Sequence, residues 1–179
     1  MPLGQAKTGL LVPLQDFGML ELIQTQTFTN VLYVDFNSIE ESTYGTHMFM
    51  FNVDKTGARL DIQLFENGVI ENAGVYHYSR KHISTAIDGD SYNTNLTGMT
   101  LDTSGGYTVG YGYIFNAGDS TKHTLMREMN AHMDTVPNHR THFGAFGLPQ
   151  KSVVDGFRFI PTSNTISGTI SIYGIKEGT

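Results

Sequence analysis

The stretch Gly168-Thr-Ile-Ser-Ile-Tyr-Gly-Ile-Lys176 alternates apolar and polar residues. A period of two places successive side chains on opposite faces of a strand, so Ile170 and Ile172 share one face. Simple continuation of this alternation would turn Ile175 outward. We expect instead a β-bulge at Gly174 that returns Ile175 to the core. The stretch therefore predicts a strand that is buried on one face only.

The same period of two recurs along the chain. Phe157 and Phe159 bracket Arg158, and we expect residues 153–161 to pair with 168–176 as a closing hairpin. Asn67-Gly68 is the strongest hairpin signal. Residues 122–132 fit either a helical turn or a strand paired with 107–116, and the strand is favoured. Strands are expected over 19–28, 31–36, 47–53, 58–65, 69–80, 107–116, 122–132, 153–161 and 168–176, with a short one at 96–101 in a long connection over 81–106 and an irregular segment over 133–150.

These signals predict an all-β fold, an antiparallel β-sandwich of jelly-roll-like form over residues 19–179. Residues 1–18 contain two prolines and three glycines among scattered apolar residues, which predicts an extended N-terminal arm. Such a segment cannot pair its own backbone groups. It is either a frayed terminus or an arm that packs on a neighbouring subunit, and its apolar content favours the second.

Composition excludes several classes of function. The 179 residues carry a formal charge of −6, so we expect no nucleic-acid partner, because phosphate binding needs a basic stripe. The chain has no cysteine, which excludes disulfides and thiolate metal sites. No apolar run reaches the roughly 18 residues that a membrane span needs, and no signal-peptide core is visible. A protein made in the host cytoplasm without a membrane partner is expected.

Part of the chain resembles a known group of proteins. Residues 154–176, ending in Gly168-Thr-Ile-Ser-Ile-Tyr-Gly-Ile-Lys176, are similar to the C-terminal signature of tailed-bacteriophage virion proteins. His47-Met-Phe-Met-Phe-Asn52 and Ser120-Thr-Lys-His-Thr124 are similar to other parts of these proteins. Over residues 142–148 the chain departs from the pattern, since it lacks the usual tryptophan. The resemblance implies a β-sandwich in a virion, as a minor structural, head-decoration, head-fibre or tail protein.

Histidines and carboxylates are the first candidates for chemistry. Asn138-His-Arg-Thr-His142 places two imidazoles three residues apart, with Asp134 nearby. A metal site needs three or four converging ligands, so polar-face histidines are the simpler interpretation. A pH-sensitive subunit contact is a further possibility for these histidines. Asp88-Gly-Asp90 hints at calcium without the spacing of an EF-hand loop. The remaining candidates of these types are His77, His82, His123, His132, Glu40 and Glu41.

No catalytic motif emerges from the sequence. Carboxylate spacing alone cannot show a glycosidase pair, and no Gly-x-Ser-x-Gly elbow or phosphate-binding loop is present. Gly105-Gly106-Tyr107 and the glycines at 110 and 112 fit turns and strands. We therefore assign no catalytic, cofactor or metal residue and expect no enzyme.

Tyrosines give the remaining signal. Tyr76, Tyr78, Tyr107, Tyr111 and Tyr113 alternate on strand-like segments. They could line a sugar-binding face, since lectins often use jelly rolls. Packing in the core and between subunits is the favoured interpretation, because tyrosine is common there and sugar platforms mostly use tryptophan.

The sequence and the resemblance together lead to one hypothesis and one alternative. The chain is expected to be a capsid-decoration or head-associated protein that stabilises a tailed-phage virion through oligomeric contacts. Its partners would be copies of itself, as a homotrimer, and the major capsid protein or other virion proteins. The alternative is a tail or fibre module that recognises a host-surface glycan.

Overall fold

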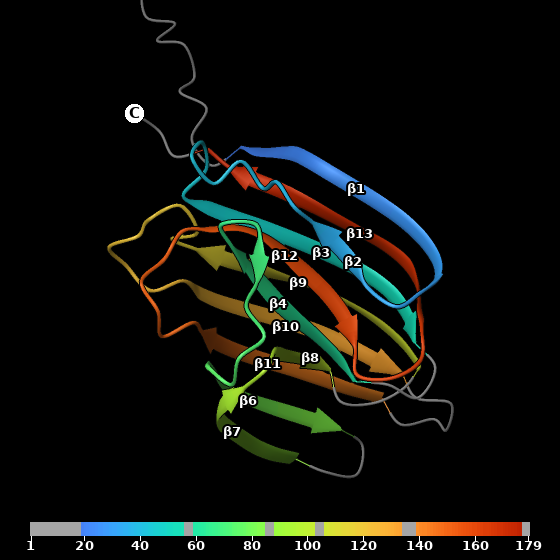
Figure 1. Cartoon of the computed structure of the whole chain (residues 1–179). Helices are drawn as coiled ribbons and strands as arrows, with labels where there is room; N and C mark the ends of the chain where they lie inside the picture. The colour runs from blue at the N-terminus through green and yellow to red at the C-terminus, as the bar shows by residue number, and fades with distance from the viewer. Residues whose placement is uncertain (1–18, 56–58, 85–87, 103–105, 134–138, 177–179) are drawn as a thin grey trace, which may run out of the picture.

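The computed structural model describes residues 19–55, 59–84, 88–102, 106–133 and 139–176; the predicted arm over 1–18 lies outside them. Within these ranges every regular element is a strand, as predicted (Figure 1). The strands are β1 (Leu20–Val31), β2 (Val34–Phe36), β3 (Thr46–Lys55), β4 (Leu60–Glu66), β5 (Val69–Ile70), β6 (Tyr76–Ser84), β7 (Asp88–Leu96), β8 (Met99–Asp102), β9 (Gly106–Phe115), β10 (Leu125–Met133), β11 (His139–Gly147), β12 (Val154–Pro161) and β13 (Ile166–Ile175).

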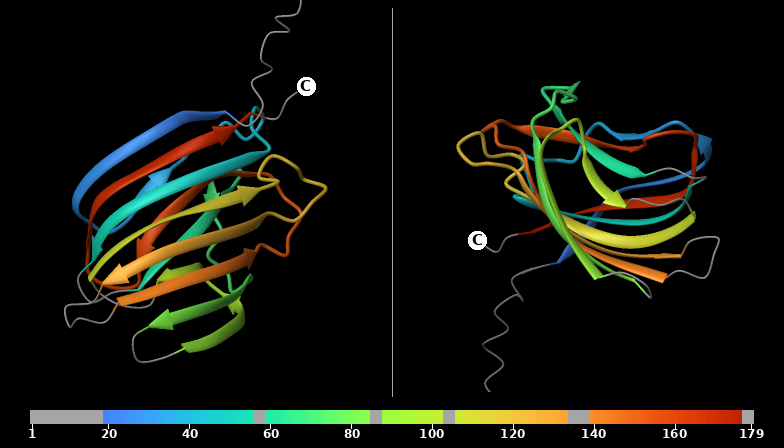
Figure 2. Two further views of the ribbon diagram at one scale, coloured as in Figure 1. Left: turned by 180° about the vertical axis from the view of Figure 1, so that it is seen from behind. Right: turned by 90° about the horizontal axis from the view of Figure 1, so that it is seen from below.

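The strands form two antiparallel sheets that pack face to face. The larger sheet has the order β1-β13-β3-β9-β10-β11-β6-β7. The smaller sheet has the order β2-β12-β4-β5, and β8 pairs with β4. Figure 2 shows the larger sheet curving along one side of the smaller one. This arrangement confirms the predicted all-β antiparallel sandwich.

Strand β13 lies inside the larger sheet, between β1 and β3. Its Ile170 and Ile172 are fully buried, as the alternation predicts. The predicted bulge is wrong: β13 stays in unbroken register with β3, with Gly174 opposite His47 and Ile175 opposite Thr46. Gly174 therefore faces inward and Ile175 faces outward. The space above Gly174 is filled by the ring of Tyr44, so the glycine makes room for an aromatic side chain.

The predicted closing hairpin is also wrong. β12 lies in the smaller sheet between β2 and β4, whereas β13 belongs to the larger sheet. The link between them crosses from one layer to the other. Both strands bury alternate side chains in the same core, and that pattern is the same whether two strands pair edge to edge or face each other across a sandwich.

An aromatic cluster joins the two sheets at the centre of the core. The ring centroid of Phe159 on β12 lies 5.6 Å from that of Phe49 and 6.1 Å from that of Phe51, both on β3. Each such pair contributes about 0.5–1.5 kcal/mol beyond the burial of area. On the neighbouring β9, Gly110 and Gly112 lie against the Phe51 and Phe49 rings, where a Cβ would come within 2.6 Å and 2.3 Å of ring carbons. These two glycines are strand residues, as predicted.

Two predicted connections turned out to contain strands. The 81–106 connection holds the end of β6 and all of β7, together with β8, which matches the short strand expected at 96–101; the 133–150 segment holds β11. Both regions are rich in polar residues and glycine, so their strands depend on pairing with neighbours more than on local preference. The Asn67-Gly68 turn is confirmed, with φ of 53° and 74°, but its return strand β5 has only two residues. Residues 125–133 form the strand β10 paired with β9, as favoured.

The packing of Tyr44 over Gly174 gives a stability prediction. A Cβ at residue 174 would lie 2.3 Å from Cγ of Tyr44, so Gly174→Ala must displace the ring. We expect a loss of about 1–3 kcal/mol in the free energy of unfolding, measured by urea denaturation. Gly147→Ala is the matched control in the same sheet, since its Cβ would meet only the flexible Leu125 side chain at 3.4 Å. Equal stability of the two variants would contradict this account of Gly174.

Candidate functional site

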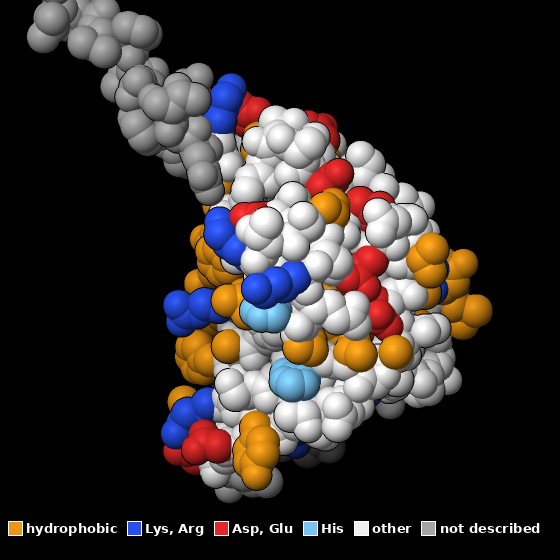
Figure 3. Space-filling model, turned by 60° about the vertical axis from the view of Figure 1, so that its left-hand side comes forward, with side chains coloured by type: hydrophobic (Ala, Val, Ile, Leu, Met, Phe, Trp, Pro, Cys, Tyr) orange, Lys and Arg blue, Asp and Glu red, His pale blue; other side chains and the backbone are white. Residues whose placement is uncertain are grey.

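The outer face of the larger sheet, which faces away from the smaller sheet, is unusually apolar. Side chains that alternate with the core residues of each strand point to this face. Figure 3 shows the face in profile, with hydrophobic side chains and basic groups along the left-hand margin. Contiguous apolar patches of this kind mark binding surfaces. The exposed large hydrophobic residues on this face are Leu20, Leu22, Met50, Ile83, Tyr92, Tyr107, Val109, Tyr111, Leu125, Met129, Met133 and Phe143.

A groove of about 850 Å³ runs across this face, and strand register explains where it lies. Arg127 on β10 is flanked by Tyr113 on β9 and by Ala145 on β11. The same row continues through Ser79 on β6 to Tyr92 on β7. Ala145 and Ser79 are small, so they leave a hollow between the larger side chains at the two ends of the row. We call this hollow the groove.

A second row of side chains forms one wall of the groove. Tyr111, Met129, Phe143, Lys81 and Asp90 lie opposite one another in register across β9, β10, β11, β6 and β7. The hydroxyl of Tyr111 donates to Sδ of Met129 at 3.6 Å. This wall is apolar at the β9 end and charged at the β7 end.

The aromatic residues of β9 form a continuous ladder beside the groove. Tyr111 and Tyr113 contact edge to face with ring centroids 6.2 Å apart. Tyr113 and Phe115 stack at 6.1 Å. These contacts fix the orientation of the rings, so the groove is bordered by a preformed aromatic surface.

The charges at the groove are distributed unevenly. Lys81 has carboxylate neighbours, with its Nζ 3.3 Å from Asp88 and 3.9 Å from Asp90. Arg127, in contrast, makes no ion pair with any residue that the structure describes. Its guanidinium is exposed beside the aromatic ladder. The groove therefore offers a cation to a ligand.

The five candidate tyrosines divide between the two faces of the larger sheet. Tyr107, Tyr111 and Tyr113 lie together on the outer face of β9. Tyr76 is fully buried in the core, where its hydroxyl donates to the Glu71 carbonyl at 2.8 Å and burial raises its pKa. Tyr78 also points inward and packs against Phe146. A single sugar-binding face of all five is thus wrong, because β6 carries its tyrosines at inward positions.

The histidines do not converge on a metal. His139 and His142 point to opposite faces of β11, because residues three apart on a strand must do so. His142 is buried beside His82, with ring centroids 5.9 Å apart. His132 is also buried, while His77 and His123 are exposed; Asp134 lies outside the described residues. Among the residues that the structure places, no three His, Asp or Glu side chains could hold a metal ion.

The candidate carboxylates lie in an ion-pair cluster and in a turn. Asp88 and Asp90 flank Lys81 on the sheet surface, which disfavours a calcium ion between them. Glu40 begins the turn before Tyr44, where its carbonyl accepts hydrogen bonds from the Thr43 and Tyr44 amides. Glu41 follows it in the same turn.

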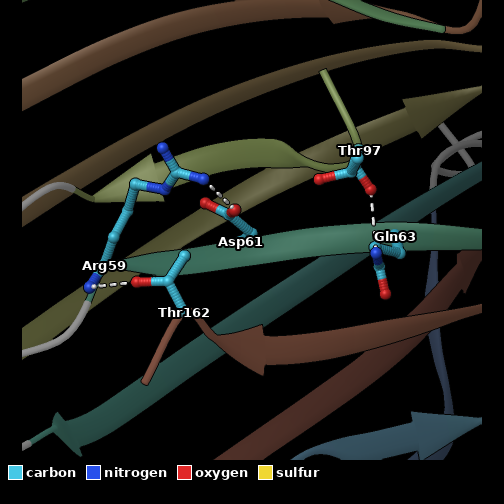
Figure 4. Close-up of polar contacts among 5 residues, drawn as sticks. All are labelled: Arg59, Asp61, Gln63, Thr97 and Thr162. Carbon is cyan, nitrogen blue, oxygen red and sulfur yellow. Dashed lines mark hydrogen bonds and ion pairs between the residues drawn. The ribbon is translucent and has the colours of Figure 1, made fainter. Parts of the chain in front are cut away.

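Asp61 is a buried carboxylate that belongs to no sequence motif. Figure 4 shows Arg59 donating to it at 2.7 Å, while Gln63 on the same strand donates to the Thr97 carbonyl at 2.8 Å. Burial raises the pKa of Asp61 despite the nearby Arg59 guanidinium. Asp61 lies on β4 of the smaller sheet and does not line the groove.

A second surface of interest is the open side of β1, which we call the β1 edge. Within the described ranges, no strand pairs with this side. The only charged residue of β1 is Glu21, whose carboxylate accepts a 2.5 Å hydrogen bond from Tyr44 and lies 3.5 Å from Lys176. Leu20 and Leu22 are exposed on β1, and Leu32 and Tyr33 are exposed just beyond its end. The opposite edge, β7, carries Asp88 and Asp90 instead.

No protein-family model matches the chain, and no curated protein matches it in sequence. In the part of the chain that the structure covers, no helix is long and apolar enough to cross a membrane.

Sequence reasoning missed the residues that define the groove. Arg127, Tyr92 and Phe143 come from three strands, and two of these strands, β7 and β11, lie in segments expected to be connections. Their common face follows from register alone. On β10, Leu125 and Met129 alternate with buried residues on either side of Arg127. This alternation was the local signal that the strand presents apolar side chains outward.

His47 was also missed, and it gives a pH prediction. The side chain is buried on β3, and its Nε2 donates to the Ile39 carbonyl at 2.7 Å. Burial lowers the pKa of His47 below its ordinary value of 6.5. The unfolded chain therefore takes up a proton first, so stability present above about pH 6.5 is lost as the pH falls towards the folded-state pKa.

We expect His47→Gln to reduce this loss, because a glutamine amide can donate to the same carbonyl without titrating. The measurement is the free energy of unfolding at about pH 7 and about pH 5, compared with wild type. His77→Gln, at an exposed position, is the control and should keep the wild-type pH dependence. An unchanged pH dependence in His47→Gln would contradict the assignment.

Proposed function

We propose that this chain is a structural component of a tailed-phage virion that assembles through the β1 edge, most simply as a capsid-decoration or head-associated protein. The observation that carries the proposal is the β1 edge itself. A strand of twelve residues offers unpaired backbone groups and exposed leucines at the border of a sheet. Its one charged side chain is occupied by Tyr44 and Lys176.

This edge has no lysine or proline to discourage pairing, and its register with β13 is regular over Gln24–Phe28, between irregularities at Leu22/Gln24 and Phe28/Val31. Natural proteins discourage edge-to-edge pairing with lysine, proline, inward charges or very short edge strands. β7 follows that rule with its two aspartates beside Lys81, whereas β1 does not. The larger sheet thus has one open edge at β1 and one charged edge at β7. This difference favours a defined subunit contact at β1.

The resemblance to virion proteins concerns the strand next to this edge. β13, which contains the signature stretch, pairs along the length of β1 and holds it in place. Thr25 and Ser171 share a hydrogen bond of 2.8 Å between these strands, and Thr27 and Thr169 share one of 3.1 Å. Pairing of β1 with β1 of a second copy would close a two-fold dimer, so the homotrimer that the sequence suggests requires β1 to contact a different surface of its neighbour. Either closed oligomer would bind a shell through many weak contacts acting together.

A second candidate function is a tail or fibre module that recognises a host-surface glycan. The groove favours it, because aromatic rings, a cation and hydroxyl groups lie together on an accessible face. The number of copies in purified virions, measured by quantitative mass spectrometry, separates the two: a decoration protein is present in many copies and a tail module in few.

Assembly through the β1 edge can be tested directly. Leu22 is 59 % exposed, so Leu22→Lys should leave the fold intact while placing a charge at the contact. We expect wild type to elute as an oligomer in size-exclusion chromatography with light scattering, and Leu22→Lys to elute as a monomer. Val69→Lys, at a residue 69 % exposed on β5, is the matched control and should stay oligomeric.

The far-UV circular-dichroism spectra of all three proteins should agree, which shows that the fold is intact in each. A monomeric wild-type protein at high concentration, or an oligomeric Leu22→Lys variant, would refute assembly through this edge.

A further inference from the structure

We propose that the groove binds an oligosaccharide that carries a carboxylate, with Arg127 as the residue that contacts the carboxylate. This goes beyond assembly, since the groove is lined from Ile175 on β13 and Thr46 on β3 across to β7 and includes no residue of β1. It stands whether the protein is placed on a head or on a tail.

The first reason is that the guanidinium of Arg127 has no carboxylate partner in the described part of the chain. Other arginines are engaged: Arg158 forms a bidentate pair with Asp35, at 2.6 Å and 2.8 Å. Arg59 pairs with Asp61, and the guanidinium of Arg80 lies over the ring of Tyr78. Arg127 has no carboxylate partner among the described residues and is exposed at the groove. A guanidinium binds a carboxylate through two parallel hydrogen bonds, which gives both affinity and orientation.

The shape of the groove is the second reason. Arg127 on β10 and Tyr92 on β7 are separated by three strand spacings, or about 14 Å. The hollow between them is floored by Ala145 and Ser79, so it is long, shallow and open. An extended chain of a few sugar rings fits such a hollow better than a compact ligand does.

The mixture of aromatic and polar groups is the third reason. Tyr113 stands at one end of the row and Tyr92, which is 84 % exposed, at the other. Their rings can pack against the apolar faces of sugar rings, and their hydroxyls remain available for hydrogen bonds. Ser79, Lys81 and Asp90 add donors and acceptors that suit a ligand rich in hydroxyl groups.

Charge argues against a polyphosphate chain in the same groove. Nucleic acids need several cations that follow the phosphates. Here Lys81 is shared by Asp88 and Asp90, and those carboxylates would repel a phosphate backbone. A single carboxylate at Arg127, with neutral hydroxyls towards β7, matches the groove from end to end.

Titration calorimetry with the full chain tests the proposal. The probes are 3′-sialyllactose and a tetrasaccharide with a single glucuronate, each compared with an uncharged counterpart, lactose or the corresponding neutral tetrasaccharide. We expect saturable binding of at least one acidic probe, with its neutral counterpart at least about tenfold weaker, as a charge-assisted hydrogen bond implies.

Variants locate the site. Arg127→Gln should weaken the binding of the acidic probe by about tenfold to a hundredfold and leave the binding of its neutral counterpart unchanged. The affinity of Arg127→Lys for the acidic probe should lie between those of wild type and Arg127→Gln, since lysine keeps the charge but cannot donate two parallel hydrogen bonds. Tyr92→Ala should weaken both probes. Lys151→Gln, at an exposed position outside the groove, is the control and should bind like wild type. Leu22→Lys should also bind like wild type, so failure of assembly and failure of this site are distinguishable.

Outcomes of three kinds would overturn the proposal. One is the absence of saturable binding for every acidic probe at millimolar concentration with folded protein. Another is equal binding of acidic and neutral probes, or acidic binding that survives Arg127→Gln. The third is equal or tighter binding of triglutamate, which would assign the groove to an acidic peptide instead.

Discussion

The contact between the rings of β3 and β12 is the constraint on which the sandwich depends. Phe49 and Phe51 meet Phe157 and Phe159 across the two layers, and their ring centroids are 5.6–6.3 Å apart where these rings contact between layers. The two rings on β3 fit only because the neighbouring strand has glycines at 110 and 112. With the inner side chains of β3 and β9 committed to this contact, the alternate side chains of both strands must face outward. The aromatic ladder of the groove is therefore the other face of the core.

Strands were predicted well from the sequence where one face of the strand is buried and the other is exposed to solvent. β3 is an example, with Phe49, Phe51 and Val53 inward and Met50, Asn52 and Asp54 exposed, and β13 is another. Prediction failed where a strand is held mainly by its neighbours, as in the Asp- and Asn-rich β7 and the His- and Gly-containing β11. It also failed to separate pairing from facing for β12 and β13, because alternation reports which side is buried and says nothing about which strand lies alongside.

The groove illustrates a different limit. Tyr111 and Tyr113 were visible as candidates because they alternate within one strand. Arg127 and Tyr92 are 35 residues apart in the chain by number and share a row only through β11 and β6. Such a site is made by the lateral order of strands, which is the part of the fold that local patterns specify least. The β1 edge is hidden from local reasoning for the same reason, since an edge strand and a central strand can have the same alternation.

The position of β13 has a consequence for how the protein is made. This strand lies between β1 and β3, and Leu20 pairs with Ile175, so the first strand can join the larger sheet only after the thirteenth has been synthesised. Until then the nascent chain leaves the inner edge of β3 without its partner. Pairings between residues this far apart in sequence form slowly. Until they form, unpaired strand edges that can associate with other chains stay exposed. Completion of the sheet therefore waits for the synthesis of β13, and premature termination upstream of residue 166 would release a chain that cannot close the sheet.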